Sequence, residues 1–257
     1  MIIQLKSSAE IEKLYRADQV VAEALASMAE AAVPGVSTAF LDEIARKIIE
    51  KRKAKSAFLG YPNPSGGAAF PATVCASVND VVVHGIPSED IVLKSGDILS
   101  LDFGVFLDGW CGDSALTVAI GDVRPEVRSL MDTTRACLEA AIEQSRLGKR
   151  LGDVGHAVQT LAESRGFGVV HEFVGHGIGK KMHEPPAIPN LGKPGTGERI
   201  RIGMTYAIEP MINMVSPDVK VDADGWTART VDGEYSAHFE HSIAVTPDGP
   251  RVLSQIS

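Results

Sequence analysis

The spacing of apolar residues predicts helices and strands along most of the chain. The N-terminal segment MIIQLKSSAEIEKLYRADQVVAEAL has charges in every ten-residue window, so it reads as an amphipathic helix after a Ser-Ser-Ala-Glu start rather than as a signal peptide. The segments GVSTAFLDEIARKIIEKRK and GKRLGDVGHAVQTLAESRG show the same helical period. The stretches ILSLDFGVF and SALTVAI predict strands, and the Asp108-Gly109 pair between them predicts a two-residue hairpin turn.

An internal repeat organises these elements. In each half a helical stretch, ending in VPG or RLG, precedes a second helix. The segment VVVHGIP then matches FVGHGIG, and LKSGDILSLDFG matches RIGMTYAIEP when Gly96 is set on Gly203. Finally CGDSALTV matches FEHSIAV. We therefore interpret residues 1–257 as a single domain made of two related halves, roughly 10–122 and 123–250.

The repeat predicts an α+β fold. Two halves related by a pseudo-twofold axis would join their strands into one curved, mainly antiparallel sheet, with four helices on its outer face. Matched residues would then meet on the inner face. The alignment places Asp102 on Glu209 and Asp113 on Glu240, so each half contributes two acids to that face.

If these acids are buried, they need a positively charged partner. In the predicted hairpin, Asp102 lies opposite Ala115, which makes Asp113 its diagonal neighbour on the same face. Buried carboxylates need compensation, and no Lys or Arg occurs between residues 94 and 124. A bound cation is the simplest source. Four carboxylates together with His176 form an oxygen-rich set that suits two metal ions roughly 3.5–4 Å apart.

The composition excludes several classes of protein and of binding partner. The chain has 257 residues, 44% of them hydrophobic and 23% charged, and it has no uncharged run long enough for a membrane span. Acidic residues outnumber basic ones 33 to 25, and the Lys and Arg are scattered, so no direct nucleic-acid motif is expected. A surface patch for an RNA-rich partner is compatible with this composition. Three cysteines without CxxC spacing favour buried thiols in a reducing, cytoplasmic setting. Nothing demands more than a monomer.

Several motifs between about Glu10 and Val252 resemble a known family. They are VHGIP, LDFG with GDSALTV, GHGIG, MHEPP, AIEPM, GWTARTVDG and FEHS. At these residues the chain resembles the type I methionine aminopeptidases of the bacterial short form, metallopeptidases with the pita-bread fold. The resemblance implies removal of the N-terminal methionine from nascent polypeptides, preferentially where the second residue is small.

The resemblance also implies a mechanism. Two divalent ions, with Co, Mn, Fe(II), Zn and Ni as candidates, would activate a bridging water that attacks the first peptide carbonyl. Asp113 and Glu240 would bridge both ions, Asp102 would chelate one, and His176 with Glu209 would complete the other. Glu209 resembles the residue proposed to shuttle the proton. The two non-ligand histidines that would contact the substrate near the scissile bond are His84 and His183.

The methionine pocket is expected to be apolar. The resemblance suggests walls formed by Phe70, Cys75, Met182, Trp226 and Tyr61. The chain departs from the family pattern in a longer segment between Tyr61 and Cys75, and also in Gly104 and Phe58, where many relatives carry Thr and Cys. The remaining histidines are expected to be structural or on the surface; these are His156, His171, His238 and His241.

Two alternatives share this fold. A proline-specific aminopeptidase or dipeptidase would use the same five ligands, but the segment around Trp226 favours the methionine enzyme. A non-catalytic pita-bread binding module should have lost ligands, and none is missing from this sequence.

Overall fold

The computed structural model describes residues 2–255, so the two ends of the predicted domain, residues 1 and 256–257, lie outside the described part. Helix α1 (Ser8–Ala31) begins at Ser7, whose hydroxyl accepts from the backbone N–H of Glu10 while the Glu10 carboxylate accepts from the backbone N–H of Ser7. This reciprocal cap satisfies two backbone donors that a helix start leaves free. The predicted N-terminal helix is confirmed.

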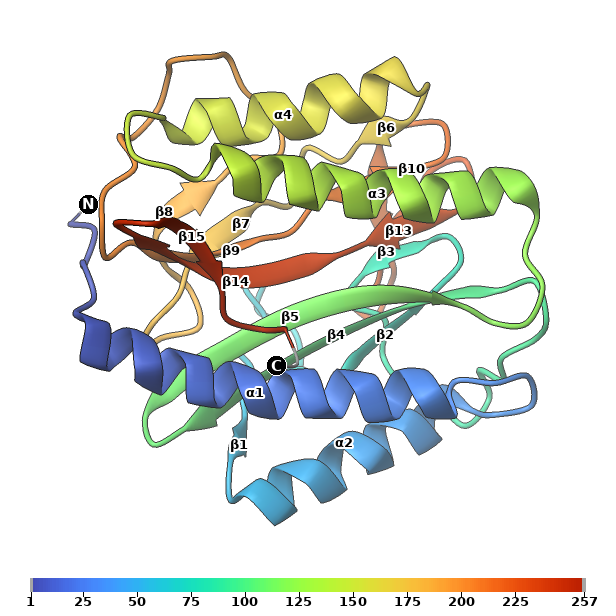
Figure 1. The fold of residues 1–257 in the computed structure, drawn as a ribbon. Coiled ribbons are helices and arrows are strands. Elements are labelled where there is room, and N and C mark those ends of the chain that lie inside the picture. The colour runs from blue at the N-terminus through green and yellow to red at the C-terminus, as the bar shows by residue number, and fades with distance from the viewer. Residues whose placement is uncertain (1, 256–257) are drawn as a thin grey trace.

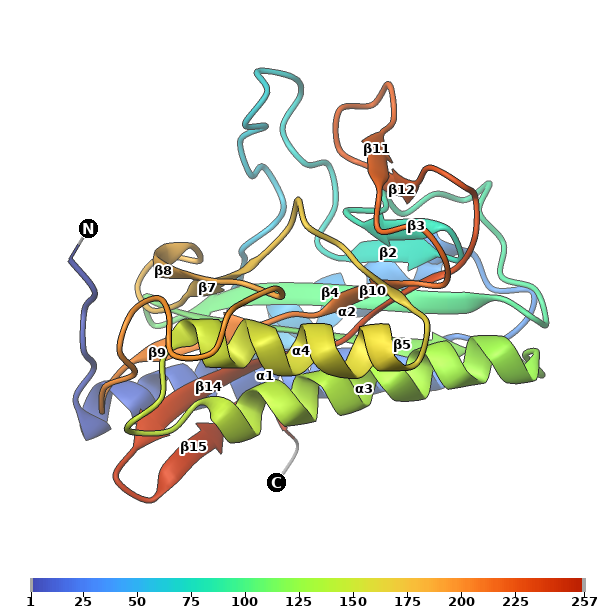
Figure 2. The ribbon, with the colours of Figure 1, turned by 90° about the horizontal axis from the view of Figure 1, so that it is seen from above.

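Three further helices complete the outer layer. They are α2 (Thr38–Arg52), α3 (Pro125–Gln144) and α4 (Leu151–Ser164). Helix α3 has proline at its first position, where no backbone donor is needed. In Figure 2 helices α1, α3 and α4 lie below β4 (Ile98–Leu107) and β5 (Trp110–Ala119), and long loops project upward from the opposite side.

The central hairpin is formed by β4 and β5. Asp108 and Gly109 both have positive φ, as the predicted two-residue turn requires. Leu107 pairs with Trp110 and Asp102 pairs with Ala115, which confirms the predicted register. Asp102 and Asp113 therefore lie on the same face of the sheet.

The hairpin is the centre of a nine-stranded antiparallel sheet. Its order is β1-β4-β5-β14-β9-β7-β8, with β2 on β4 and β15 on β14 (Figure 1). Its other strands are β1 (Lys55–Ser56), β2 (Cys75–Val78), β7 (Gly175–Gly177), β8 (Glu184–Ile188), β9 (Thr205–Ile208), β14 (Glu240–Thr246) and β15 (Gly249–Val252). The curved sheet with helices on one face confirms the predicted α+β class.

Two small sheets lie beside the large one. The first has the order β13-β10-β6 and the second has the order β11-β12-β3. Their strands are β3 (Val81–Val83), β6 (Gly168–Val169), β10 (Met211–Asn213), β11 (Val219–Val221), β12 (Ala228–Thr230) and β13 (Ser236–His238).

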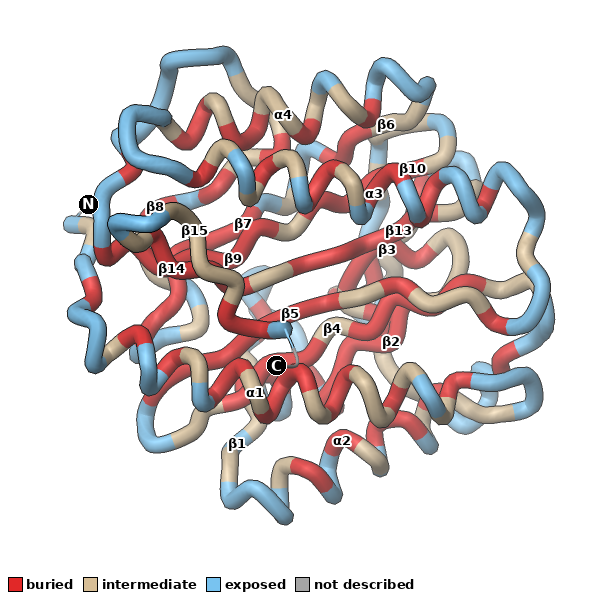
Figure 3. Tube along the Cα trace, in the orientation of Figure 1, coloured by how far each residue is buried: buried red, intermediate tan, exposed pale blue. Residues whose placement is uncertain are grey.

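The core fills the space between sheet and helices. Buried residues follow the strands and the inner faces of the helices, whereas the outer helix faces are exposed (Figure 3). Helix α1 crosses β5 so closely that a Cβ at Gly112 would lie 2.6 Å from the backbone of Ala17. Within residues 2–255, none of the helices combines the length and the apolar character needed to cross a bilayer.

Positions matched by the repeat have similar local geometry. Gly96 and Gly203 both adopt positive φ, 100° and 86°, immediately before the strands that lead to the matched acids. At the seam, β5 and β14 pair directly, with Ala115 opposite Glu240. These features support the proposal that the chain is one domain of two related halves.

Candidate metal centre and active site

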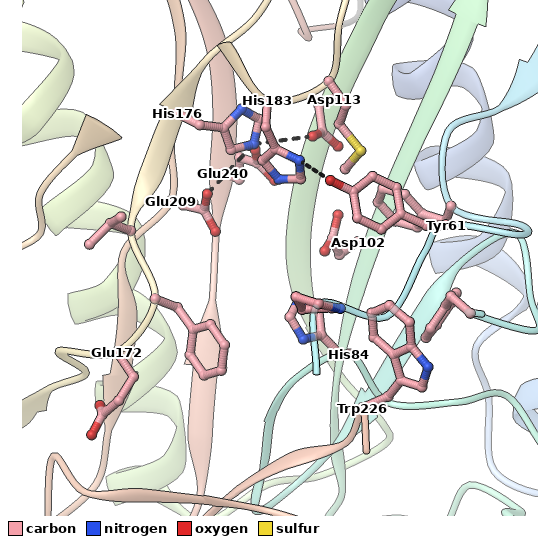
Figure 4. Close-up of a pocket in the computed structure, with 16 residues that line it drawn as sticks. Tyr61, His84, Asp102, Asp113, Glu172, His176, His183, Glu209, Trp226 and Glu240 are labelled. Atoms are coloured by element: carbon pink, nitrogen blue, oxygen red, sulfur yellow. Dashed lines mark hydrogen bonds and ion pairs between the residues drawn. The ribbon is translucent and has the colours of Figure 1, made fainter. Parts of the chain in front are cut away.

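Four adjacent strands, β4, β5, β14 and β9, align the acids of the site. Ala115 on β5 pairs with Asp102 on one side and with Glu240 on the other. Asp113 lies two residues along β5, and since side chains alternate along a strand it faces the same way as Ala115. Glu209 directly follows β9, whose last residue Ile208 pairs with His241 of β14. The sheet therefore brings the predicted acids of both halves to one cavity (Figure 4).

His176 completes the cluster from β7. Its Nε2 lies 3.6 Å from Asp113 Oδ2 and 3.8 Å from Glu209 Oε1. Its Nδ1 is 3.1 Å from the backbone carbonyl oxygen of Gly177 and can donate to it, which turns Nε2 toward the acids. Ligand atoms of Asp113, His176 and Glu240 all lie within 4.8 Å of one another. Asp102 and Glu209 line the same cavity but lie outside this tightest group.

Burial makes the negative charge of the cluster costly. It raises the pKa of Asp102 to about 7. It also raises the pKa values of Asp113, Glu209 and Glu240 well above their ordinary range, with repulsion between the carboxylates as the second cause. For His176 burial has the opposite effect and lowers the pKa to about 4, so the imidazole is neutral and can ligate.

The cluster fits divalent cations. Within residues 2–255, Lys and Arg form no ion pair with any of the four acids; the basic side chains that lie near them are the imidazoles of His176 and His238. Asp113 Oδ1 is buried and has no hydrogen-bond partner. Buried carboxylates persist in a fold when something positive pairs with them. Carboxylate oxygens with one imidazole nitrogen are suitable ligands for Mn, Fe, Co and related ions.

A second histidine borders the cluster. His183 has its ring 4.3 Å from that of His176, and its Nδ1 is 2.7 Å from the hydroxyl oxygen of Tyr61. The turn that carries His183 is fixed by Glu184, whose carboxylate accepts from the backbone N–H groups of Lys180 and Lys181 and pairs with buried Lys6 at 2.6 Å. The N-terminal segment thus helps to position a residue of the site.

His84 lies across the cavity, on the same side as Trp226 in Figure 4. It has a positive φ of 60°, which non-glycine residues seldom adopt and which is often found at functional sites. Its ring lies edge-on to those of Phe173 (5.4 Å) and Trp226 (6.2 Å). Burial lowers the pKa of His84 to about 4, so this ring is neutral too.

The cavity has a volume of about 390 Å³ and an aromatic wall. Four of the five predicted pocket residues line it: Tyr61, Phe70, Met182 and Trp226. The fifth, Cys75, does not line it; its side chain is buried in the same apolar cluster as Phe70 and Trp226. Cys75 thus belongs to the same cluster as the aromatic wall, and its role as a wall residue stays a prediction.

The long segment after Tyr61 forms part of the rim. Asn63 donates from Nδ2 to the backbone oxygen of Gly225, and Trp226 donates from Nε1 to the backbone oxygen of Ala68. These bonds tie loops from the two halves together over the aromatic wall. Pro64, from the middle of this segment, lines the cavity.

The two unusual positions beside the cluster are linked. A Cβ at Gly104 would lie 3.0 Å from both Asp113 Oδ1 and the ring of Phe58. Gly104 therefore leaves room for Phe58, which lines the cavity.

Comparison with known proteins places the chain. The profile of metallopeptidase family M24 matches residues 10–247. A methionine aminopeptidase of Aquifex aeolicus is 46% identical over 260 residues, covering all of both chains. The crystal structure of a methionine aminopeptidase from Thermotoga maritima superposes with a TM-score of 0.95 at 43% identity, covering 99% of this chain and 100% of that one. The chain belongs to the methionine aminopeptidases of metallopeptidase family M24.

Membership of the M24 family implies a divalent metal and confirms the pita-bread fold. The proline-specific branch is more distant. An Xaa-Pro dipeptidase from Bacillus anthracis is 20% identical with a TM-score of 0.76, and the match covers only 62% of its chain. That likeness shows a common fold alone.

Two buried groups of this M24 chain were not predicted as part of the site. His238 was expected to be structural or on the surface, but its Nε2 is buried, unpartnered and 3.8 Å from Glu209 Oε2. Asp18 on α1 is fully buried and accepts from the backbone N–H of Asp113 at 3.0 Å. Asp18 lies in an apolar helix face far from Asp113 in sequence, so its only signal was a charge at a core position of the helical pattern.

Proposed function

We propose that this methionine aminopeptidase removes the first residue of nascent polypeptides with two divalent cations held by five side chains. One observation carries the proposal. Four carboxylates, two of them buried (Asp113 and Glu240) and two partly buried (Asp102 and Glu209), face a cavity with an aromatic wall together with a neutral imidazole. Within residues 2–255 they have no Lys or Arg partner. Asp113 and Glu240 would hold both ions, Asp102 would hold one, and His176 with Glu209 would hold the other.

Divalent cations in this site would supply Lewis acidity, which ionises a water molecule near neutral pH and polarises the peptide carbonyl. The protein's own groups complete the reaction. Glu209 accepts the proton of the attacking water and passes it to the amine that leaves. Without bound ions, burial and then the neighbouring Asp102 charge raise the pKa of Glu209, so this carboxylate takes up a proton more readily than a free one.

The two non-ligand histidines would contact the substrate. Burial lowers the pKa of His183 below its usual value, and the Tyr61 hydroxyl can donate to its Nδ1. The neutral ring then carries its proton on Nε2, from which it can donate to the oxygen that develops negative charge. His84 lies across the cavity and would contact the peptide near the scissile bond.

The aromatic wall accounts for the choice of methionine. Phe70 and Trp226 lie edge-to-face at 5.3 Å, and Met182 packs against the same cluster. An unbranched thioether packs well against such surfaces. We expect the residue after methionine to be small, because the His84 side of the cavity is crowded by Phe173 and Trp226.

The setting is proposed to be the cytoplasm, where nascent chains emerge. All three cysteines, Cys75, Cys111 and Cys137, are free and buried, which agrees with a reducing compartment. We propose a monomer whose partners are peptide N-termini and, by surface contact, the ribosome.

Chelation followed by metal restoration tests the proposal. The protein is stripped with EDTA, and each candidate ion is added back in turn with Met-Ala-Ser or Ala-Pro-Ala as substrate. Release of free methionine only after restoration is expected. Faster cleavage of Ala-Pro-Ala would favour a proline-specific enzyme, and absence of cleavage with every ion would favour a binding module.

A further inference from the structure

His238 is a buried imidazole without an assigned role. It is the last residue of β13 and only 1% exposed. Its backbone is held on both sides by Thr117 of β5, whose Oγ1 accepts from the His238 N–H at 3.0 Å and donates to the His238 carbonyl at 2.7 Å. The hairpin that carries Asp113 therefore also fixes the position of this ring.

The ring is directed at Glu209. The Glu209 carboxylate lies between two imidazoles: Oε1 is 3.8 Å from His176 Nε2, and Oε2 is 3.8 Å from His238 Nε2. The backbone of Glu209 is anchored separately, since its carbonyl accepts from Asn190 Nδ2 at 3.0 Å. The two oxygens of one carboxylate thus face different partners.

The unpartnered nitrogen needs a bond. His238 Nε2 is buried without a hydrogen-bond partner, and a buried polar group left unpaired is destabilising. A shift of roughly 1 Å in the Glu209 side chain would bring Oε2 to the usual N–H···O distance. A bound ion that attracts Oε1 would hold the Glu209 carboxylate in one orientation.

We propose that His238 is a positioning residue, which donates from Nε2–H to Glu209 Oε2 and leaves Oε1 to ligate beside His176. The proposal rests on the proposed role of Glu209 as a ligand. His238 acts through Glu209 rather than by ligating directly, because the five proposed ligands line the cavity and His238 does not. Such outer contacts fix the orientation of metal ligands, and their loss typically weakens metal binding roughly 10–100-fold.

Metal affinity gives a direct test. Binding of Mn²⁺ to the EDTA-stripped protein is measured by titration calorimetry for the parent, His238→Leu, which has no donor, and His238→Gln, which keeps one. His241→Gln serves as the matched control, because His241 is a neighbouring half-buried histidine whose Nδ1 lies 2.8 Å from Ser254 Oγ. Circular dichroism and thermal unfolding check the fold. If the Leu variant does not fold, His238→Asn, whose donor is too short to reach Glu209, replaces it.

We expect His238→Leu to raise the Kd for Mn²⁺ roughly 10–100-fold, while the Gln variant and the His241 control stay within about threefold of the parent. Cleavage of Met-Ala-Ser by the Leu variant should lose kcat at subsaturating Mn²⁺ and regain most of it as Mn²⁺ is raised. Unchanged Mn²⁺ affinity in the Leu variant, or equal losses of affinity in the Leu and Gln variants, would overturn the proposed role of His238. If the parent still needed metal for cleavage, the proposed function would stand. A parent that binds no Mn²⁺ would overturn both.

Discussion

Replacing Asp102 by Asn should stabilise the metal-free protein and impair its metal-bound form. The reason lies in the pKa of Asp102, which burial raises from 3.8 to about 7. A carboxyl with a raised pKa in the folded state contributes its stability below the unfolded pKa and loses it as the pH rises through the folded value. Asparagine has nearly the same shape and does not ionise, so it avoids this loss.

The expected size follows from the shift. About three pKa units correspond to roughly 4 kcal/mol, which is an upper limit because the neighbouring carboxylates titrate together with Asp102. Near pH 4, Asp102→Asn should therefore match the parent in free energy of unfolding. By pH 8 the variant should be more stable by up to roughly 4 kcal/mol. Comparing variant with parent cancels the histidines, whose lowered pKa values act in the opposite direction.

Urea unfolding of the EDTA-stripped parent and variant at pH 4, 6 and 8 provides the assay. With saturating Mn²⁺ the order should reverse, because the parent binds the ion more tightly and ligand binding stabilises the folded state. A variant that is less stable than the metal-free parent at pH 8 would refute the reasoning. It would mean that the buried acid has a favourable partner other than a cation.

Three other substitutions test the supports of the site. Tyr61→Phe removes the hydroxyl that can donate to His183, so kcat/KM for Met-Ala-Ser should fall roughly 2–10-fold without a change in folding; unchanged kinetics would argue against that bond. Lys6→Met leaves Glu184 without its buried partner and should cost about 3–5 kcal/mol in urea unfolding; a loss below about 1 kcal/mol would show that the pair is dispensable. Gly112→Ala drives a Cβ into the backbone of α1 and should cost roughly 1–3 kcal/mol by the same assay, and a neutral result would mean that α1 can move away freely.

The sequence predicted those parts of the molecule that depend on short-range patterns. Asp108-Gly109 determines the hairpin register, and the register places Asp102 and Asp113 on one face. The repeat added Glu209 and Glu240, and the sheet seam between β5 and β14 brings them together with the first pair. Each of these steps uses either turn chemistry or the two-residue period of a strand.

Contacts made through tertiary packing were not predictable in this way. Asp18 reaches Asp113 from the opposite layer across 95 positions, and His238 reaches Glu209 only because Thr117 of a third strand holds its backbone. Cys75 was placed in the pocket wall by resemblance; the structure buries it in the cluster of the aromatic wall residues without placing it among those that line the cavity. How deeply a side chain lies in a packed cluster depends on the sizes of side chains from several strands. The sequence of one segment does not specify these sizes.

Anomalous diffraction from crystals soaked in Mn²⁺ tests the proposed pair of metal ions. We predict two peaks roughly 3.5–4 Å apart, both within bonding distance of Asp113 and Glu240, with His176 and Glu209 on one and Asp102 on the other. A lack of peaks among these residues, or a lone ion that leaves Asp113 and Glu240 unshared, would contradict it.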